Sequence, residues 1–254
     1  MPSKFALPML ILLFAVACKT DKKAESEPAG DSPEPIATAE QNSLTSKEKA
    51  DGWMLLFDGS STNGWHLYNN ADAKPVWEAK EGMLACEPIN GTGDHGDLVT
   101  DREYENYELV FDWKTSESGN SGVFINVKES PDIVKTYHTG PEYQLLDPSH
   151  LDQAVLAKRS GCLYNFAPQL NETETRPAGQ WNHSRIRQQD GKVEFYLNGN
   201  LTARADFNSR EWADMVKASG FKDYADFGKA TKGHIALQEW TSNIWFRNIK
   251  IREL

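Results

Sequence analysis

The chain has 254 residues and a formal net charge of −10 at pH 7. This acidic balance argues against nucleic acid or an anionic membrane surface as the partner of its folded part. All eight Trp residues lie beyond residue 50, so the portion able to bury a core, residues 51–254, has the length of one domain.

The first eighteen residues are typical of a secretory signal. Lys4 precedes an apolar run from Phe5 to Ala17, which is too short to span a bilayer and has the length of a signal-peptide core. The run ends in Ala15-Val16-Ala17-Cys18, which resembles the lipobox of bacterial lipoproteins; an ordinary secretory signal is the alternative. We expect residues 1–18 to be a lipoprotein signal peptide, with lipidated Cys18 anchoring the protein at the bacterial cell envelope, on the periplasmic side or the outer-membrane surface.

Residues 19–50 differ in composition from the remainder of the chain. Lys, Glu and Asp alternate there with Ala, Ser and Pro, and no aromatic residue is present. Such a segment buries too little apolar surface to offset the entropy lost on ordering. The composition predicts a disordered acidic linker over residues 19–50, which leads into the domain at residue 51.

Short strand patterns dominate the domain. Residues 107–114 alternate Leu109, Phe111 and Trp113 with polar or smaller side chains, which is the period of a strand with one buried face. A helix is expected from Ser209 to about Ser219. The same reasoning predicts further strands over residues 122–127, 140–147, 192–197, 201–205, 233–240 and 244–251, with an Asn198-Gly199 hairpin turn. Many short strands separated by polar turns indicate an all-β sandwich or jelly roll.

The strand at residues 140–147 carries two polar side chains on one face. Glu142 and Gln144 point to one side of the strand, while Tyr143 and Leu145 point to the other. Burying a carboxylate and an amide is costly unless they meet partners or a solvated site. We therefore expect this strand to form the centre of a binding or catalytic face.

Other strands add amides and rings to the same face. Because Ile235 and Leu237 should pack in the core, Gln238 and Trp240 face the opposite side, and Asn120, Phe124 and Asn126 share one face of their strand. Amides donate to and accept from hydroxyl groups, and rings pack on the apolar faces of sugars. This set predicts a site for a neutral sugar; the alternative is that the amides satisfy buried backbone groups at bends.

An ordered series of motifs resembles one known family. The series comprises Leu56-Phe57-Asp58-Gly59 with Gly64-Trp65, Gly96-Asp97-Leu98-Val99-Thr100, Asn120-Ser121-Gly122, Gly140-Pro141-Glu142-Tyr143-Gln144, Gly161-Cys162-Leu163-Tyr164, Pro177-Ala178-Gly179-Gln180-Trp181-Asn182, Leu197-Asn198-Gly199, Leu237-Gln238 and Phe246-Arg247-Asn248-Ile249. In this order it resembles the 3-keto-disaccharide hydrolase family (DUF1080) over nearly all of residues 52–254. The resemblance implies a concanavalin A-like jelly roll of two curved antiparallel sheets, whose concave face holds sugar.

The implied activity is the cleavage of 3-keto-glycosides by base-assisted elimination and hydration. Ordinary glycoside hydrolysis needs two carboxylates, but a 3-keto sugar needs one base or acid and a donor to the ketone oxygen. We expect a catalytic role for Glu142, Gln144 and Glu239, although Glu239 falls on the core-facing phase unless its strand has ended. The residues expected to bind the sugar are Asn120, Asn126, Tyr164, Gln238 and Trp240. A glycoside oxidoreductase that makes the ketone would be a fitting partner.

Two positions depart from the family pattern. The chain reads Leu237-Gln238-Glu239-Trp240-Thr241 where relatives usually read Leu-Gln-Asp-His-Gly, and Phe195 stands where many carry a histidine. An indole cannot transfer a proton at neutral pH, so a catalytically weak carbohydrate-binding lipoprotein is the alternative function. The candidates to replace the histidine are His95, His138, His150 and His234, each more typical of an ordinary surface or turn residue.

Metal and cysteine signals are weak. Residues 94–97, Asp-His-Gly-Asp, are typical of a tight turn, and Ca²⁺ is a minor alternative; we expect no other cofactor. Beyond Cys18 only Cys86 and Cys162 are present, and two cysteines alone do not determine whether they form a disulfide.

Overall fold

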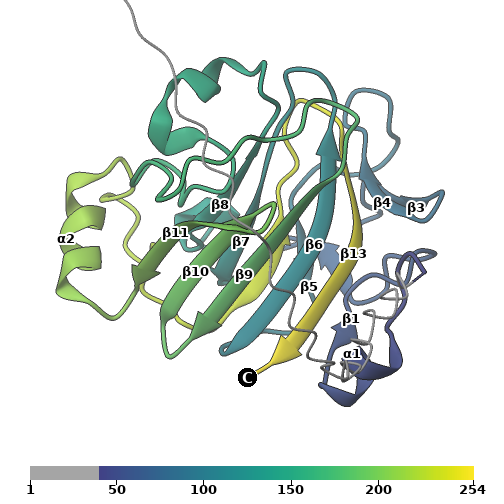
Figure 1. The fold of residues 1–254 in the computed structure, drawn as a ribbon, viewed down its shortest axis with the longest axis horizontal. Helices are drawn as coiled ribbons and strands as arrows, with labels where there is room; N and C mark the ends of the chain where they lie inside the picture. The colour runs from purple at the N-terminus through teal and green to yellow at the C-terminus, as the bar shows by residue number, and fades with distance from the viewer. Residues whose placement is uncertain (1–39) are drawn as a thin grey trace, which may run out of the picture. The chain divides into compact units, whose positions relative to one another are not determined.

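The computed structural model describes residues 40–254, which form two antiparallel sheets (Figure 1). The eight-stranded sheet runs in the order β11 (Asn200–Asp206), β10 (Lys192–Leu197), β9 (Asn182–Gln189), β6 (Tyr107–Thr115), β13 (Ile244–Glu253), β4 (Met83–Cys86) and β3 (Trp77–Lys80), with β1 (Met54–Leu55) paired to β13. The five-stranded sheet runs β2 (Trp65–Leu67), β5 (Leu98–Thr100), β12 (His234–Leu237), β7 (Asn120–Val127) and β8 (Glu142–Leu146). The predicted all-β sandwich is confirmed.

Few helices accompany the sheets. The predicted helix is α2 (Arg210–Ala218), which begins where the Ser209 hydroxyl accepts a hydrogen bond from the Trp212 amide at 3.1 Å. Single 3₁₀ turns are found at η1 (Thr136–His138), η2 (Leu151–Ala154) and η3 (Leu156–Lys158). No helix within residues 40–254 is long and apolar enough to cross a membrane.

The core lies between the sheets and is rich in aromatic rings. On β6 the buried side chains alternate as predicted, and the Phe111 ring lies 5.9 Å from that of Tyr143 on the other sheet. Phe195 on β10 is also fully buried, with its ring 5.0 Å from Tyr143. Phe195 therefore packs between the sheets and does not reach an outer surface.

The domain begins earlier than the predicted boundary at residue 51. A helix, α1 (Ser46–Ala50), is capped by Thr45, and Glu48 forms an ion pair of 2.7 Å with Lys250 on β13. Asn42 and Asn248 exchange backbone-to-side-chain hydrogen bonds of 2.7 and 2.8 Å. Residues 40–50 are thus part of the fold rather than of a disordered linker. Residues 19–39 and the signal peptide with Cys18 lie outside the described residues.

One large strand has no clear sequence signal. β9 points Asn182, Ser184 and Gln188 into the molecule, where apolar side chains would be expected. Each is satisfied there: Ser184, for example, accepts a hydrogen bond from the Trp113 indole at 2.9 Å. Because these inward residues are polar, the alternation of polarity that identifies a half-buried strand is absent.

The two cysteines of the domain are free. Cys86 lies on β4 and Cys162 follows β8, and both are fully buried. Burial raises the pKa of both thiols, that of Cys162 to about 11, so both remain protonated at neutral pH. The disulfide that the sequence left open is not formed.

Candidate active site on the five-stranded sheet

A cavity of about 250 Å³ opens on the outer face of the five-stranded sheet. Polar side chains from β7, β8 and the end of β12 meet there with aromatic rings from the segments around them. Its lining residues are Asn120, Tyr137, Glu142, Gln144, Tyr164, Phe221, Gln238 and Trp240. The structure therefore brings together six of the eight predicted site residues, and Asn126 and Glu239 lie elsewhere.

The position of Glu142 depends on a glycine in the neighbouring strand. Glu142 pairs with Phe124 and Gln144 pairs with Gly122 across the β7–β8 ladder. The Glu142 carboxyl group leans over Gly122, where a Cβ atom would overlap Oε1 and Cδ of Glu142. Only glycine leaves this space, so Gly122 determines where the carboxyl group lies.

Glu142 is a buried acid without a compensating partner. Its exposed fraction is 9%, and no hydrogen bond from residues 40–254 stabilises its charged form. Burial and, secondarily, the negative charge of Asp97 raise the pKa of Glu142 well above its ordinary value. A carboxyl group of this kind can hold a proton near neutral pH and return it, which is the property of a general acid or base.

Asp97, which immediately precedes β5, does not line the cavity, but its charge acts on Glu142, and the sequence reasoning missed this influence. Its carboxylate accepts hydrogen bonds from the Thr136 hydroxyl and, at 2.9 Å, from the Glu239 backbone N–H. Burial raises the pKa of Asp97 to about 6 even though these donors oppose the shift. The signal was present in the Gly96-Asp97-Leu98 motif, but nothing local indicated that Asp97 approaches Glu142.

Glu239 does not line the cavity, contrary to its predicted catalytic role. β12 ends at Leu237, and the Glu239 backbone turns toward Asp97. The Glu239 carboxylate accepts a hydrogen bond from the Gly96 N–H and pairs with the His95 ring. It therefore fixes the turn at residues 93–97 next to the site and is not itself free to act on a ligand.

Asn126 is also displaced from the predicted face, because a β-bulge interrupts β7. Val127 pairs with His234 and Phe124 with Ala236, so two residues of β7 oppose one of β12. Asn126 has a φ of 57° and turns inward, where its amide donates to Gln188 Oε1 at 2.7 Å. Strict alternation along the strand, on which the prediction rested, fails at the bulge.

The amides of the cavity have unused hydrogen-bonding capacity. Asn120 Oδ1 is buried and has no partner among the described residues. Gln144 Oε1 accepts from the Leu145 N–H at 3.0 Å, and no described group pairs with its amide nitrogen. Buried polar atoms left in this way are costly unless a ligand or water completes them. The floor can therefore both accept from and donate to hydroxyl groups.

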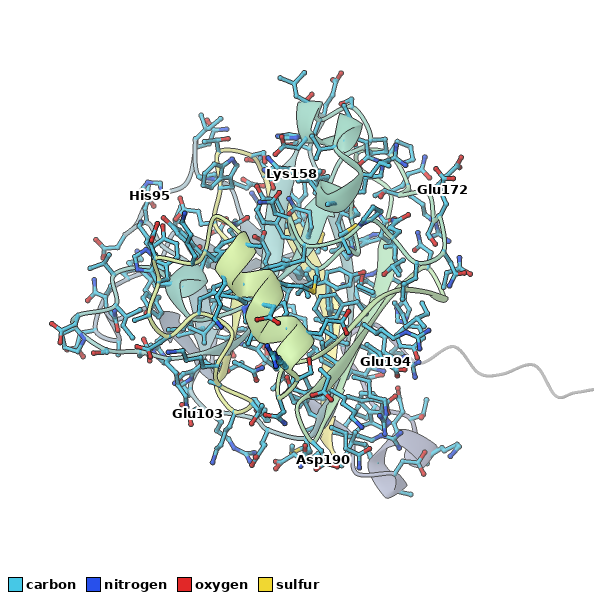
Figure 2. The ribbon with its side chains drawn as sticks, turned by 90° about the vertical axis from the view of Figure 1, so that its left-hand side faces the viewer. His95, Glu103, Lys158, Glu172, Asp190 and Glu194 are labelled. Atoms are coloured by element: carbon cyan, nitrogen blue, oxygen red, sulfur yellow. The ribbon has the colours of Figure 1, made fainter. Side chains whose placement is uncertain are left out.

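Aromatic rings form the walls. Trp240 is 51% exposed, and the Phe221 ring stacks on Phe227 with centroids 4.3 Å apart. Lys158, seen above α2 in Figure 2, lies 5.5 Å over the Tyr164 ring. Phe221 and Tyr137 were not predicted because they lie in segments without a periodic pattern, after α2 and in η1.

The four candidate histidines have partners outside the cavity lining. His95 contacts Glu239, the His138 ring stacks on Tyr224 at 4.2 Å, His150 accepts from the Asp152 N–H at 3.1 Å, and His234 donates to the Thr100 carbonyl at 2.6 Å. None of the four lines the cavity. Within residues 40–254, no three His, Cys, Asp or Glu side chains are arranged to hold a metal ion.

Comparison with known proteins gives consistent matches. The sequence model described as 3-keto-alpha-glucoside-1,2-lyase-like domain matches residues 52–252. A 3-keto-disaccharide hydrolase from Bacteroides thetaiotaomicron is 30% identical over an alignment of 276 residues, gaps included. The alignment covers 94% of this chain and 94% of the relative. Two structures of candidate glycosyl hydrolases from Parabacteroides distasonis are also similar. The first has a TM-score of 0.77 and 31% identity, and the match covers 84% of this chain and 99% of that one. The second has a TM-score of 0.60 and 27% identity, and the match covers 80% of this chain and 99% of that one.

Proposed function

The chain belongs to the 3-keto-alpha-glucoside-1,2-lyase-like family of carbohydrate hydrolases, and from this premise we propose that it cleaves 3-keto-glycosides by elimination followed by hydration. The observation that carries the proposal is the buried, unpartnered carboxyl group of Glu142 at the floor of a cavity lined by amides and rings. One such acid suffices for this chemistry, whereas ordinary glycoside hydrolysis requires two at a defined separation.

The first step is removal of a proton from the substrate. The C3 ketone acidifies the C2–H bond, and the ionised form of Glu142 takes the C2 proton while the electron pair forms an enolate. A carboxylate with a raised pKa is a stronger base than an ordinary one. The amides of Gln144 and Gln238 donate to the developing enolate oxygen at C3.

Elimination and hydration complete the cycle. The enolate collapses, a C1–C2 double bond forms, and the C1–O bond breaks. Glu142, now protonated, gives its proton to the leaving oxygen. Water then adds at C1 of the enone while Glu142 accepts one of its protons, and C2 recovers a proton, so the net reaction is hydrolysis. Glu142 thus acts in turn as base and acid, which its raised pKa favours.

The lining fits an uncharged sugar. Asn120 Oδ1 can accept a hydrogen bond from a sugar hydroxyl, and the exposed Trp240 ring can stack on an apolar sugar face. The second candidate function, capture of glycans without turnover, is favoured by one observation: no histidine lines the cavity, and Trp240 occupies the position where relatives usually carry one.

The proposal extends to the setting of the enzyme. We infer that Cys18 carries a lipid and holds the domain at the cell envelope, where an oxidoreductase that forms the 3-keto group would supply its substrate. Incorporation of a radiolabelled fatty acid into the wild-type protein but not into Cys18→Ala would support the anchor, and labelling of both would contradict it.

The deciding experiment compares two substrates. A 3-keto-glucoside with a chromogenic leaving group and its unoxidised parent are each incubated with the purified protein, and release is followed by absorbance. Release from the keto substrate alone is the expected result. Saturable glycan binding without release from either substrate would instead establish the capture function, and release from the parent alone would exclude elimination.

A further inference from the structure

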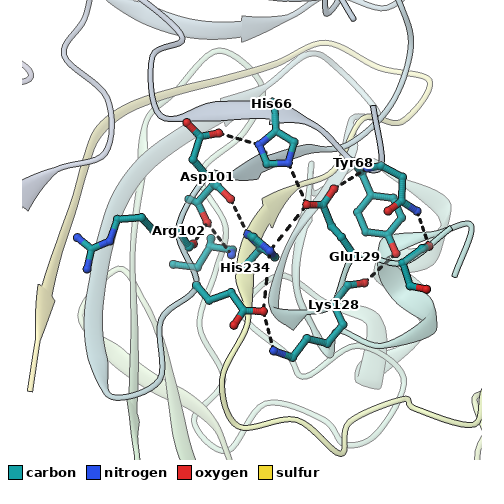
Figure 3. A network of polar contacts seen from close by, with 12 residues as sticks. His66, Tyr68, Asp101, Arg102, Lys128, Glu129 and His234 are labelled. Atoms are coloured by element: carbon teal, nitrogen blue, oxygen red, sulfur yellow. Dashed lines mark hydrogen bonds and ion pairs between the residues drawn. The ribbon is translucent and has the colours of Figure 1, made fainter. Parts of the chain in front are cut away.

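A second polar cluster lies on the outer face of the same sheet, at the edge opposite β8 (Figure 3). His66 on β2 stands between two carboxylates: its Nδ1 is 2.7 Å from Asp101 Oδ1 and its Nε2 is 2.9 Å from Glu129 Oε2. A neutral imidazole has one N–H and can donate to only one of them. Two hydrogen bonds to carboxylates require the imidazolium form.

The charged and titratable groups around His66 come from three other strands or the residues next to them. Glu129 follows β7, Asp101 follows β5, and His234 on β12 presents its ring 6.2 Å away. The His234 Nε2 atom is 3.8 Å from Glu129 Oε2 and 3.9 Å from Glu103 Oε1. The remaining charged groups at the cluster are Lys128, 2.6 Å from Glu103, and Lys232, whose charge also acts on Glu103.

His66 bonds to a segment that reaches the cavity. We call residues 128–139 the pocket strap. Near its start, Glu129 Oε1 accepts from the Asn69 N–H at 2.6 Å, and the Tyr68 hydroxyl donates to the Ile133 carbonyl at 2.7 Å. The backbone N–H of Lys128 donates to Thr139 Oγ1 at 3.0 Å, which joins the two ends of the strap.

The other part of the pocket strap carries site residues. The Thr136 hydroxyl donates to Asp97, and the Tyr137 ring lines the cavity. The strap therefore connects the His66 cluster with the Asp97 carboxylate, whose charge acts on Glu142, and with one wall of the cavity.

We propose that His66 is a positioning residue: its imidazolium clamps Glu129 and thereby holds the pocket strap, with Thr136 and Tyr137, against the site, and the clamp is released when His66 loses its proton. The structural part of this inference stands alone, and its effect on turnover rests on the proposed function. Loss of the proton leaves one N–H for two carboxylates and turns one attraction into a repulsion, so Asp101 and Glu129 compete for the neutral ring and release of the clamp means that Glu129 is held for only part of the time.

The pH range follows from the direction of the pKa shift. Burial of the ring disfavours its charge, but the hydrogen bonds to Glu129 and Asp101 outweigh burial and raise the pKa of His66 above 6.5. Stability from a group with a raised folded pKa is fully present below the unfolded value and is lost as pH rises through the folded value. The clamp is thus closed in mild acid and released on the alkaline side.

Hydrogen exchange of the pocket strap in the full-length protein tests the clamp. After correction for the intrinsic pH dependence of exchange, residues 128–139 should lose about tenfold in protection as pH rises through the His66 titration. In His66→Gln the strap should exchange fast at every pH. The matched control is His183→Gln on the other sheet, where the His183 ring pairs with Asp112 at 2.9 Å; it should behave as wild type. Strap protection that is independent of pH in the wild type would overturn the clamp.

Two further measurements keep the clamp and the proposed activity separable. NMR titration of the His66 ring in the wild type should give a pKa above 6.5, and Glu129→Gln should lower it; an ordinary or lower value in the wild type would overturn the clamp even if His66→Gln fails to fold. With a 3-keto-glycoside, KM should rise with strap release while kcat changes less. Release of the strap without any turnover would support the clamp and contradict the proposed activity. Normal turnover with the same KM in the wild type and in His66→Gln would support the activity and contradict an effect of the clamp on the site.

Discussion

Polar groups at the cavity on the five-stranded sheet are left unpaired, whereas those on the outer face of the eight-stranded sheet are paired. On the eight-stranded sheet, the Glu108 carboxylate is bound by Arg185 at 2.8 Å and also by Arg252. On the five-stranded sheet, Glu142 has no hydrogen-bond donor and Asn120 Oδ1 has no partner within residues 40–254. Because unpaired buried groups cost free energy in the absence of a ligand, the cavity is suited to binding, whereas the paired groups of the eight-stranded sheet stabilise the fold.

Trp240 at the cavity also differs from the rings on the outer face of the eight-stranded sheet, although Lys158 covers the neighbouring Tyr164 ring. On the eight-stranded sheet cations cover the rings: the Arg185 guanidinium lies 3.8 Å over the Tyr196 ring, and Arg247 lies 4.1 Å over Trp181. On the five-stranded sheet Trp240 is half exposed, and no cation covers it among the described residues. This contrast singles out the exposed Trp240 ring as a surface left open for a ligand.

Replacing Glu142 should have the largest effect on activity and should separate the roles of the two faces most clearly. Glu142→Gln keeps the shape of the side chain but cannot take the C2 proton, so kcat on a 3-keto-glycoside should fall about 10³-fold. The matched change on the other face, Glu108→Gln, should leave kcat unchanged and lower the free energy of unfolding by about 1–2 kcal/mol. Steady-state kinetics and thermal unfolding measure both. Normal turnover in folded Glu142→Gln would refute the mechanism.

Crowding the acid should have the next largest effect. A methyl group at Gly122 would overlap the Glu142 carboxyl group and push it from its position, so Gly122→Ala should lower kcat about 10²-fold. The control is Gly220→Ala, where an added Cβ meets nothing within 4 Å. If Gly122→Ala retains full activity while its crystal structure shows a displaced Glu142, the exact location of the carboxyl group is unimportant.

The regular part of the site could be predicted from the sequence. Glu142 and Gln144 were placed correctly on the outer face because β8 alternates without interruption, and its opposite phase, Tyr143 and Leu145, lies in the core. The same reasoning failed for Asn126, since the extra residue of a β-bulge reverses the phase and no local pattern marks it.

The irregular part could not be predicted. Tyr137 and Phe221 reach the cavity from a 3₁₀ turn and a loop, where side-chain direction has no period. The influence of the Asp97 charge on Glu142 depends on sheet order, because β5 and β8 belong to the same sheet with only two strands between them. Order of strands is a long-range property that residue spacing does not encode.

Removing the charge beside the acid should shift the pH profile. The Asp97 carboxylate contributes to the raised pKa of Glu142, so Asp97→Asn should lower that pKa. Because the base form of Glu142 is active, the acidic limb of kcat/KM should move to lower pH, so Asp97→Asn should be more active than the wild type on that limb. A limb that stays in place, measured over the stable pH range, would show that Asp97 does not act on Glu142.

Substitutions of Trp240 should have the smallest effect on the kinetic constants. They also distinguish an enzyme that cleaves the sugar from a protein that only binds it. Trp240→Ala removes a stacking surface, so KM should rise about threefold to tenfold with kcat nearly unchanged. Trp240→His supplies an imidazole at the position where relatives usually carry one. If Glu142 alone transfers protons, Trp240→His should not exceed the wild-type kcat. A large gain in kcat from histidine would mean that the indole had weakened catalysis in favour of binding, and isothermal titration with a glycan should then show the wild type binding more tightly than the variant.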